Sequence, residues 1–415
     1  MNHLDLKNDI LIQGEKKVVT PLRRKALSLL KNTPIPTTRS EDWRYTDLSE
    51  IEGWDLNFTM RTPSFVQQDK INELFLQLEN KSQLVFIDGH LSSTHSKIPK
   101  DFILCHQDED SIEASDFFDL TNALFCEETL TLNIPDNTEL SSPFCILHIA
   151  TEEGHDTQHA ARLCINVGKF SKITIAEFFI TQGNFYYFSN PLLEIKLNEG
   201  AKVEHALSQE NSDRALHIGK TLYALEKDTQ LETFSYNSGA KLARHNFNIN
   251  LLCAGANAKI NGLYALEGER LNDNFLTINH YVGDTQSSQL FKGILDGKTQ
   301  GVFTGKIFIH KDAQRSSATQ LNSNLLLGSK AKIKTRPQLE IYADDVKCTH
   351  GATIGQLDPE QLFYLESRGI KKEQAQKMIT SAFSRQVIDE ITHSKLRDLF
   401  HQKMGQKFGG TKDVF

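Results

Sequence analysis

The sequence predicts a mainly β protein in which a β-solenoid core is flanked by helical regions at both ends. Three observations lead to this prediction. Short segments of alternating apolar and polar residues fill the middle of the chain, a turn pattern recurs between them, and helical periodicity is confined to the two ends. We therefore expect a mostly helical N-terminal region (1–95), a solenoid core (96–355) and a C-terminal helical domain (356–415).

Composition limits the location and the partners of the protein. The 415 residues are 39% hydrophobic and 24% charged, with a formal net charge of −7. This balance gives no reason to expect nucleic acid or an anionic membrane as a partner. The N-terminus lacks the apolar stretch of a secretory signal, and no apolar run approaches the ~20 residues that span a bilayer. We expect a cytoplasmic protein.

The cysteines do not predict a disulfide framework or a self-contained metal site. Six cysteines stand at positions 105, 126, 145, 164, 253 and 348, and no two of them form a CxxC motif. Structural zinc and iron–sulfur sites bring their ligands in short paired spacings, and disulfide frameworks belong to small secreted domains. Five cysteines are therefore interpreted as small buried hydrophobes. Cys348 alone has a polar neighbour at a useful spacing.

The N-terminal region contains a capped helix followed by an aromatic pair. Thr20 precedes Pro21 and the run LRRKALSLLK, and proline at the first helical position favours a helix start. Trp43 and Tyr45 then stand in a polar context. They either anchor this segment to the neighbouring core or form a docking surface. We favour the anchor, because a lone aromatic pair is weak support for an interface.

The central stretch consists of strands separated by regularly spaced turns. The alternating segments include SKITIAEFF (171–179), LLEIKLNEGAKVEHAL (192–207), QLETFSY (230–236), AKINGLYAL (258–266), KIFIHKDA (306–313) and AKIKTRPQLEIY (331–342). Equivalent turn positions at 172, 202, 230 and 259 are 30, 28 and 29 residues apart, which predicts stacked coils. The lack of helices between the strands excludes Rossmann and TIM folds. A β-sandwich is the alternative, although hairpin signals are few.

The sequence of the C-terminal domain predicts helices with apolar faces. Asp358 is suited to the N-cap and Pro359 to the first helical position, while Gln361 could complete a capping box. Gly369 is suited to end this helix. An apolar stripe in residues 371–391 predicts a second helix. The domain could pack on itself or offer a groove to another protein, and the sequence leaves both interpretations open.

Cys348 and His350 form the candidate functional pair. Residues two apart on a strand point to the same face, so both side chains should share one side, after a bulge or turn near residues 343–345. Two ligands make only half of a four-coordinate site. The other half would have to come from elsewhere in the chain or from a second chain. A Cys–His catalytic dyad and a purely structural pair are the other interpretations.

Two enzymatic interpretations find little support in the sequence. Residues 293–299, GILDGKT, have three residues between the glycines where a phosphate loop has four, and they lie between strands. We therefore expect no nucleotide to bind this chain. A free-standing solenoid enzyme acting on carbohydrate would present paired carboxylates on neighbouring coils, and no such pair stands out. That enzyme stays open as an alternative.

Several motifs, in the right order, resemble one known family: the SufB/SufD scaffolds of iron–sulfur cluster assembly. These motifs are SEDWRYTDL (40–48), KGI (292–294), FTGK (303–306), NLLL (324–327), PQLEI (337–341) and CTHGATIG (348–355). They cover the C-terminal half well and the N-terminal part more sparsely. CTHGATIG is similar to the SufD form, because SufB typically carries a glutamate where Gly351 stands. A SufB-type subunit is the alternative assignment.

The resemblance implies a right-handed parallel β-helix core and a non-catalytic scaffold. It also implies pairing with a SufB-like paralogue through the β-helix edges, and docking of a SufC-like ABC ATPase, the catalytic partner, on the C-terminal helices. A homodimer of the isolated chain is compatible with the same edges. A nascent iron–sulfur cluster would form transiently at the paralogue interface. There, the resemblance makes His350 a candidate metal ligand completed by the partner chain, with Cys348 as the weaker candidate. The residues expected to dock the ATPase are Leu362, Phe363, Leu365, Met378, Ile379 and Phe383.

Overall fold

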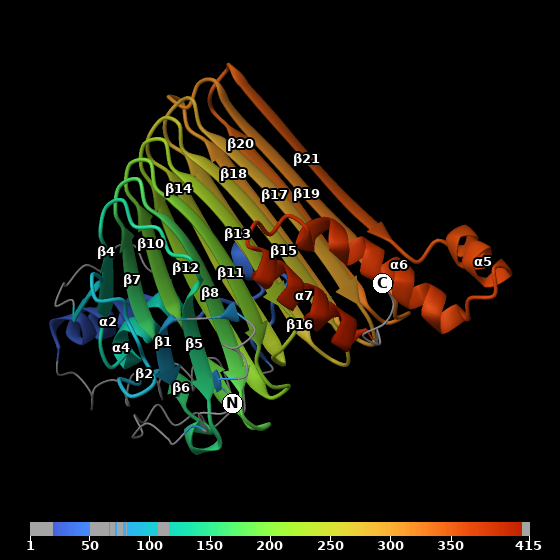
Figure 1. Ribbon diagram of the computed structural model, residues 1–415, viewed down its shortest axis with the longest axis horizontal. Helices are drawn as coiled ribbons and strands as arrows, with labels where there is room; N and C mark the ends of the chain where they lie inside the picture. The colour runs from blue at the N-terminus through green and yellow to red at the C-terminus, as the bar shows by residue number, and fades with distance from the viewer. Residues whose placement is uncertain are drawn as a thin grey trace.

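The computed structural model describes residues 20–49, 81–106 and 116–408, and a few positions between 66 and 79. Its body consists of strands stacked side by side from the N-terminal end to β21, with helices near both ends (Figure 1). Residues 1–19, 50–65 and 409–415 lie outside the described residues, so only part of the predicted N-terminal region can be compared with the prediction.

Two long sheets form this body. The first has the strand order β2-β1-β5-β8-β11-β13-β15-β17-β19-β21. Its strands are β1 (Ser82–Ile87), β2 (His90–Leu91), β5 (Phe144–Ala150), β8 (Lys172–Thr181), β11 (Lys202–Glu210), β13 (Gln230–Asn237), β15 (Asn257–Leu266), β17 (Gln286–Leu295), β19 (Ser316–Leu326) and β21 (Val346–Gly355).

The second sheet has the order β20-β18-β16-β14-β12-β10-β7-β4-β3, and β9 joins it beside β12 and carries β6. Its strands are β3 (Ile103–His106), β4 (Leu130–Ile134), β6 (Gln158–His159), β7 (Arg162–Val167), β9 (Tyr187–Ser189), β10 (Leu192–Leu197), β12 (Ala215–Leu225), β14 (Leu242–Leu251), β16 (Leu271–His280), β18 (Gln300–Ile309) and β20 (Lys332–Ile341).

From β10 onward, successive strands alternate between the two sheets, and each pairs in parallel with the strand two places later in the chain. This is the connectivity of a parallel β-helix, in which each coil adds one strand to each sheet. The predicted solenoid is therefore confirmed, and the alternative of a β-sandwich built from hairpins is wrong.

The β-helix begins before the predicted boundary at residue 96. Strand β1 (Ser82–Ile87) pairs in parallel with β5 and belongs to the first sheet. Leu84 and Phe86 pack into the interior, whereas Val85 and Ile87 pack under C-terminal residues on the outer face. A strand buried on both faces has no alternation of apolar and polar residues. Periodicity alone could therefore not identify it.

The predicted recurring turn corresponds to a recurring left-handed residue. The residue two places before a strand of the first sheet has φ between 55° and 80° in five successive coils. These residues are Phe170, Gly200, Asp228, Gly255 and Asp284. Left-handed backbone suits glycine and, less readily, Asp and Asn, which explains why small and polar residues recur at this corner.

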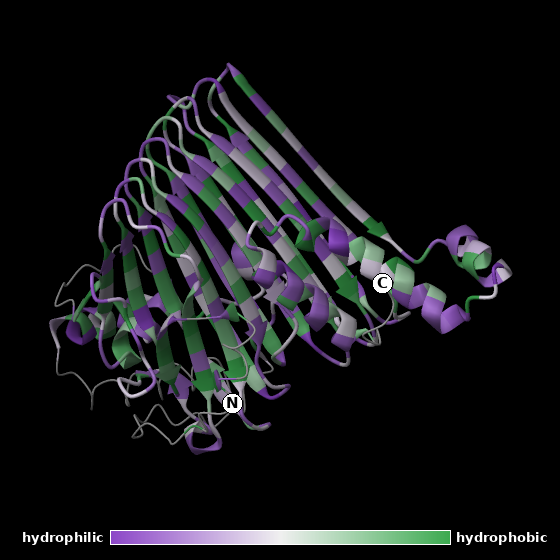
Figure 2. Ribbon diagram, viewed as in Figure 1, coloured by the Kyte–Doolittle hydropathy of each residue, from purple (hydrophilic) through white to green (hydrophobic). Residues whose placement is uncertain are grey.

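The interior is formed by alternate residues of every strand. Along the strands, hydrophobic and hydrophilic residues alternate (Figure 2). Ile195, Ile249, Ile278 and Ile307 occupy one register position on strands of the second sheet, with Tyr223 between the first two, and all four isoleucines are fully buried. Burying such a side chain contributes about 1.5–3 kcal/mol. These ladders of stacked residues are the main source of stability.

Helices cover the outer face of the second sheet at the N-terminal end. They are α2 (Pro21–Asn32), the 3-10 turn η1 (Glu41–Trp43) and α4 (Phe117–Phe125), and a further 3-10 turn η3 (Glu152–Gly154) lies in a loop. The side chain of Thr20 accepts a hydrogen bond from the backbone N–H of Arg23, as the predicted helix start requires. Trp43 is buried in this cluster, so the prediction of an anchor is confirmed for Trp43, whereas Tyr45 is half-buried and lies outside the cluster. Helix α4, whose residues are all buried, is not among the elements expected from the sequence.

A buried arginine joins the segment 40–48 to the second sheet. The Arg244 guanidinium lies between the rings of Trp43 and Phe275, at 4.1 and 4.4 Å from their centres. It donates to the Asp42 carbonyl at 2.8 Å and forms an ion pair with Asp273. Burial raises the pKa of Asp273, although the adjacent guanidinium opposes this shift. A charge this deeply buried depends on its partner.

Of the three C-terminal helices, the second and third lie on the outer face of the first sheet, whereas the first extends beyond it (Figure 1). They are α5 (Pro359–Ser367), α6 (Lys372–Ile388) and α7 (Ser394–Lys407). Asp358 caps α5 as predicted, accepting from the backbone N–H of Glu360 at 2.9 Å, and Gly369 has φ of 85° after its end. The predicted capping box is not formed, because the Asp358 side chain bonds Glu360 and no return bond from Gln361 accompanies it.

Polar groups also occupy the interior. Glu177 lies between His148 and His205, with oxygen–nitrogen distances of 3.0 and 3.3 Å. Burial would raise the pKa of Glu177, but the hydrogen bonds and charges of the two imidazoles outweigh it and hold the pKa below its usual range. His205 shares a further hydrogen bond of 2.6 Å with the Tyr223 hydroxyl. The carboxylate is thus held inside the coil by neighbouring rings.

Two further histidines are fully buried beside this group. His217 Nε2 lies 3.4 Å from His245 Nδ1, and the outer nitrogens contact Ser189 Oγ at 3.0 Å and Thr221 Oγ1 at 2.9 Å. Burial lowers the pKa of His245 to about 4 and that of His217 well below its ordinary value of 6.5. Both rings are therefore neutral at pH 7.

Replacing Arg244 by Met should unfold the protein at lower denaturant concentration, because Asp273 would remain buried without its cation. Breaking a buried pair in this way costs about 3–5 kcal/mol. Urea unfolding monitored by circular dichroism measures the change. Lys298→Met, which breaks the exposed pair with Glu269, is the control and should change the midpoint little. Equal effects of the two variants would contradict the structural role of Arg244.

Acidification should destabilise the protein through the buried histidine pair. The unfolded chain takes up protons as the pH falls below about 6.5, whereas folded His245 takes one up only near pH 4. Stability from this group is therefore complete above pH 6.5 and is lost as the pH falls through 4, a loss of about 3 kcal/mol. His245→Gln should flatten the measured dependence of unfolding free energy on pH, and exposed His155→Gln should leave it unchanged. A profile unaltered by His245→Gln would refute this assignment.

Candidate functional site

The two ends of the β-helix differ. At the N-terminal end, antiparallel strands β2 and β3 close the sheets, pairing with β1 and β4. At the other end, β20 is bonded only to β18, and β21 only to β19, among the described strands. The outer edges of β20 and β21 therefore present unpaired backbone N–H and C=O groups. Natural proteins usually protect such edges.

Cys348 and His350 both lie on the open edge strand β21. Their backbone partners on β19 are Ala318 and Gln320, both buried residues of the interior face. A turn separates β20, which ends at Ile341, from β21, which begins at Val346, as the sequence predicts. Because the register places alternate residues on one face, Cys348 and His350 face the interior side of the last coil. Cys348 packs against the core there, and His350 is exposed.

Cys348 and His350 differ in how readily their side chains could bind a metal ion. Burial raises the pKa of the Cys348 thiol, so at neutral pH the thiol form predominates over the thiolate that binds metals and attacks electrophiles. The exposed imidazole of His350 has two ring nitrogens that can serve as donor, acceptor or ligand. Within the described ranges, no group of three or more His, Cys, Asp or Glu side chains is arranged to hold a metal ion. A metal ion bound at this pair would therefore need further ligands from outside the described residues.

Apolar side chains surround this open end. The exposed large hydrophobic residues there are Leu321, Ile341, Tyr342 and Ile354. Tyr342, at 62% exposure, follows β20 directly, and Ile354 lies near the end of β21. An unpaired strand edge with an apolar rim has the features of a surface that another sheet can extend.

The residues predicted to dock the ATPase differ in how exposed they are. Helix α5 has no buried residue, and Phe363 is 71% exposed while Leu362 and Leu365 are partly buried. On α6, Met378 and Ile379 are also partly buried. Their role in docking stays a prediction.

The sixth of these residues, Phe383, faces the body of the protein instead. The ammonium of Lys292 on β17 lies 4.1 Å from the centre of the Phe383 ring and also contacts Gln386. Burial lowers the pKa of Lys292 to about 8. The sequence places Lys292 only within a motif and gives no sign of this contact, since it depends on how α6 crosses the sheet.

A carboxylate fixes the link between α6 and α7. Glu204 on β11 accepts hydrogen bonds from the backbone N–H groups of Thr392 at 2.8 Å and His393 at 3.1 Å, at the start of α7. Negative charge is stabilised at a helix N-terminus. Burial nevertheless raises the pKa of Glu204. The Thr392 hydroxyl also donates to Glu232 at 2.6 Å.

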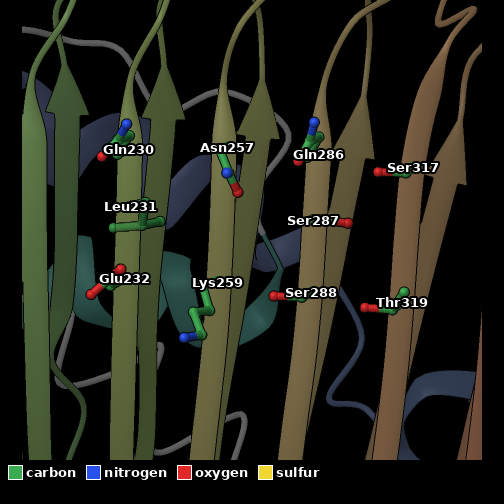
Figure 3. A pocket seen from close by; sticks show the side chains of 10 residues that line it. All are labelled: Gln230, Leu231, Glu232, Asn257, Lys259, Gln286, Ser287, Ser288, Ser317 and Thr319. Atoms are coloured by element: carbon green, nitrogen blue, oxygen red, sulfur yellow. The ribbon is translucent and has the colours of Figure 1, made fainter. Parts of the chain in front are cut away.

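A polar groove of about 300 Å³ lies beside this link. Figure 3 shows its side chains, which come from four neighbouring strands of the first sheet, β13, β15, β17 and β19. Lys259 in the groove is paired with Glu390, next to the end of α6. The groove lies next to the part of the first sheet on which α6 and α7 pack, and its lining includes neither Cys348 nor His350.

The glycine-containing segment 293–299 runs from the end of β17 through a turn into β18. Gly297 has φ of 67°, and the Asp296 carboxylate accepts its backbone N–H at 2.7 Å. The segment thus forms a corner of the β-helix and does not open a helix, as the sequence predicts. In the part of the chain that the structure describes, no helix is both long and apolar enough to cross a membrane.

Comparison with known proteins agrees with this architecture. A SufBD family protein of iron–sulfur cluster assembly from Synechocystis is 32% identical, over 96% of this chain and 93% of its own. The iron–sulfur cluster assembly protein SufD of Escherichia coli is 28% identical, over 96% of each chain. The chloroplastic protein ABCI7 of Arabidopsis thaliana is 27% identical, over 91% of this chain and 83% of its own.

The family comparison covers most of the β-helix, helix α5 and the first part of α6. Residues 148–383, more than half of the chain, match the family described as SUF system FeS cluster assembly, SufBD core domain. This region contains β21 with Cys348 and His350, and most of α6. The chain therefore belongs to the SufBD family of the SUF iron–sulfur cluster assembly system, as a SufD-type member.

Proposed function

We propose that this chain is a scaffold subunit that pairs end to end with a SufB-like paralogue and docks a SufC-like ABC ATPase. In this proposal a nascent iron–sulfur cluster, the cargo of the complex, forms transiently where the open end meets the paralogue. The chain itself performs no catalysis and binds no nucleotide, and ATP hydrolysis takes place on the ATPase partner. The cytoplasm is the proposed location.

The observation that carries the proposal is the open end with half a ligand set on it. Strands β20 and β21 leave the edges of both sheets unpaired at the end that also presents Cys348 and His350. A related β-helix with the same coil spacing could continue both sheets at once. Strand addition of this kind gives affinity through backbone hydrogen bonds. It would also bring a second chain's ligands next to His350.

Helix α5 supports a second contact. It buries none of its residues and exposes Phe363 and Tyr364. A short helix with no fully buried residue gains little stability from the rest of the chain, and exposed aromatic residues are common anchors in protein interfaces. We assign α5, together with the adjacent face of α6, to the ATPase.

The packing of α6 and α7 offers a route between the two contacts. Lys292 and Phe383 join α6 to β17, and Glu204 joins the start of α7 to β11. Strand β17 is bonded to β19, which is bonded to β21. We propose that movement of the ATPase reaches the open end through these helices and exposes the ligands for iron and sulfur.

His350→Ala should slow cluster formation by about tenfold or more in the complex with both partners. Losing a ligand should cost at least as much as losing one of its supporting contacts, which costs 10- to 100-fold. The measurement is the rate of appearance of cluster absorbance under anaerobic conditions. His155→Ala, an exposed histidine outside β21, is the control. Full activity of His350→Ala in an intact complex would remove the ligand role.

The double variant Phe363→Asp/Tyr364→Asp should lose the ATPase and keep the paralogue. Both side chains are exposed, so the fold should be unaffected while an apolar contact becomes charged. Partners captured by the tagged chain from native extract, identified by mass, measure the result. Ile354→Lys at the open end should do the reverse, and so serves as the matched control.

Capture of both partners by Phe363→Asp/Tyr364→Asp would contradict the assignment of α5. Capture of neither partner by the native chain would contradict the scaffold role itself. Recovery of only a second copy of this chain would show that the open end forms a homodimer instead.

A further inference from the structure

A ladder of amide side chains inside the β-helix leads to the open end. Gln289 on β17, Gln320 on β19 and His350 on β21 occupy one register position on three adjacent parallel strands. Both glutamines are about 3% exposed, and Gln320 Nε2 donates to Gln289 Oε1 at 2.9 Å. Such ladders form when identical side chains stack on parallel strands. His350 is the next residue in this row.

The ladder leaves one acceptor unused on Gln320, the glutamine next to His350 in the row. Gln320 Oε1 is buried and has no hydrogen-bond partner among the described residues. The amide nitrogen of Gln320 already donates a hydrogen bond to Gln289 on β17. Because oxygen and nitrogen point in different directions from a planar amide, the free oxygen is available to a partner other than Gln289. A buried carbonyl without a partner is unfavourable.

The opposite sheet is shaped to admit this amide. Gly305 on β18 faces the ladder across the interior, and a Cβ at this position would lie 1.7 Å from Gln320 Nε2 and 2.9 Å from Gln289 Oε1. Any side chain at 305 would therefore displace the Gln320 amide. Gly305 has ordinary backbone angles in the strand, so its role is to leave space. The position of the Gln320 amide thus depends on both sheets: Gln289 on the first sheet accepts its hydrogen bond, and Gly305 on the second sheet leaves space for it.

We propose that Gln320 is a positioning residue for His350. The two groups are not hydrogen-bonded in the structure. Rotation of the exposed His350 side chain would let Oε1 accept the ring N–H of His350, which fixes the tautomer and the plane of the imidazole. The other ring nitrogen then carries its lone pair toward the partner chain. Histidines that bind metals commonly donate their second ring N–H to a carbonyl in this way. The inference rests on the proposed ligand role of His350 and adds the residue that prepares it.

The first test is made on the isolated full-length chain with ¹⁵N-labelled histidine rings. Ring nitrogen shifts report the tautomer, and the His350 signal is the one missing from His350→Ala. The native chain should show one dominant tautomer. Gln320→Leu, of similar size but without an acceptor, should give a mixture, whereas Gln320→Glu keeps an acceptor at the same reach and should retain the single form. Thr319→Ala, on the outer face of the same strand, is the control and should also retain it.

A second variant tests the same contact in case Gln320→Leu does not fold. Gly305→Ala leaves Gln320 in place but displaces its amide, and should give the same mixed tautomers. In the complex, Gln320→Leu and Gly305→Ala should slow cluster formation about 10- to 100-fold, the usual effect of losing such a supporting contact. Circular dichroism and the unfolding midpoint confirm that each variant is folded.

Mixed tautomers in the native chain, or a single tautomer retained in folded Gln320→Leu and Gly305→Ala, would overturn the positioning role. This outcome is separate from failure of the proposed function. If His350→Ala supports cluster formation at the full rate, His350 is no ligand, yet the tautomer measurement on the isolated chain still decides whether Gln320 orients it.

Discussion

The constraint on which this structure depends is parallel pairing between successive coils. Every strand of a coil satisfies its backbone groups on the coil before and the coil after, so the stack must end with strands that lack one neighbour. At one end the chain solves the problem itself, with antiparallel β2 and β3 and the nearby helices. At the other end β20 and β21 remain open, and Cys348 and His350 lie on β21.

Elements from outside the β-helix reinforce the coils that approach this end. The segment 40–48 crosses several strands of the second sheet: Arg244 on β14 and Asp273 on β16 hold it, and Glu41 pairs with Arg336 on β20. On the first sheet, α6 and α7 play the corresponding part. The last coils are therefore held from both sides, which suits a surface that must keep its shape without a covering strand.

Much of this could be predicted from the sequence, because coil spacing and strand alternation are local patterns. The solenoid and the shared face of Cys348 and His350 follow from periods of about 29 and of two residues. The caps of α2 and α5 follow from the capping residues Thr20 and Asp358 and the prolines after them. Strand β1 was not predicted because it is buried on both faces and shows no alternation. Helix α4, whose residues are all buried, was not predicted either. The neighbours of His350 escaped prediction too, since Gln320 and Gly305 reach that position only through register between strands and across the interior.

The coil-by-coil register also has a consequence for how the protein is made. Each strand from β10 onward pairs with one roughly thirty residues away along the chain, so a new coil needs only the coil before it to have formed. Repeat architectures with nearest-neighbour contacts propagate structure in this way, and chains are synthesised from the N-terminus. The coils can therefore be laid down in order during translation, beginning from the closed end. The strand that carries His350 is then the last to be added, so the edge that invites another chain exists only once the rest of the body has folded.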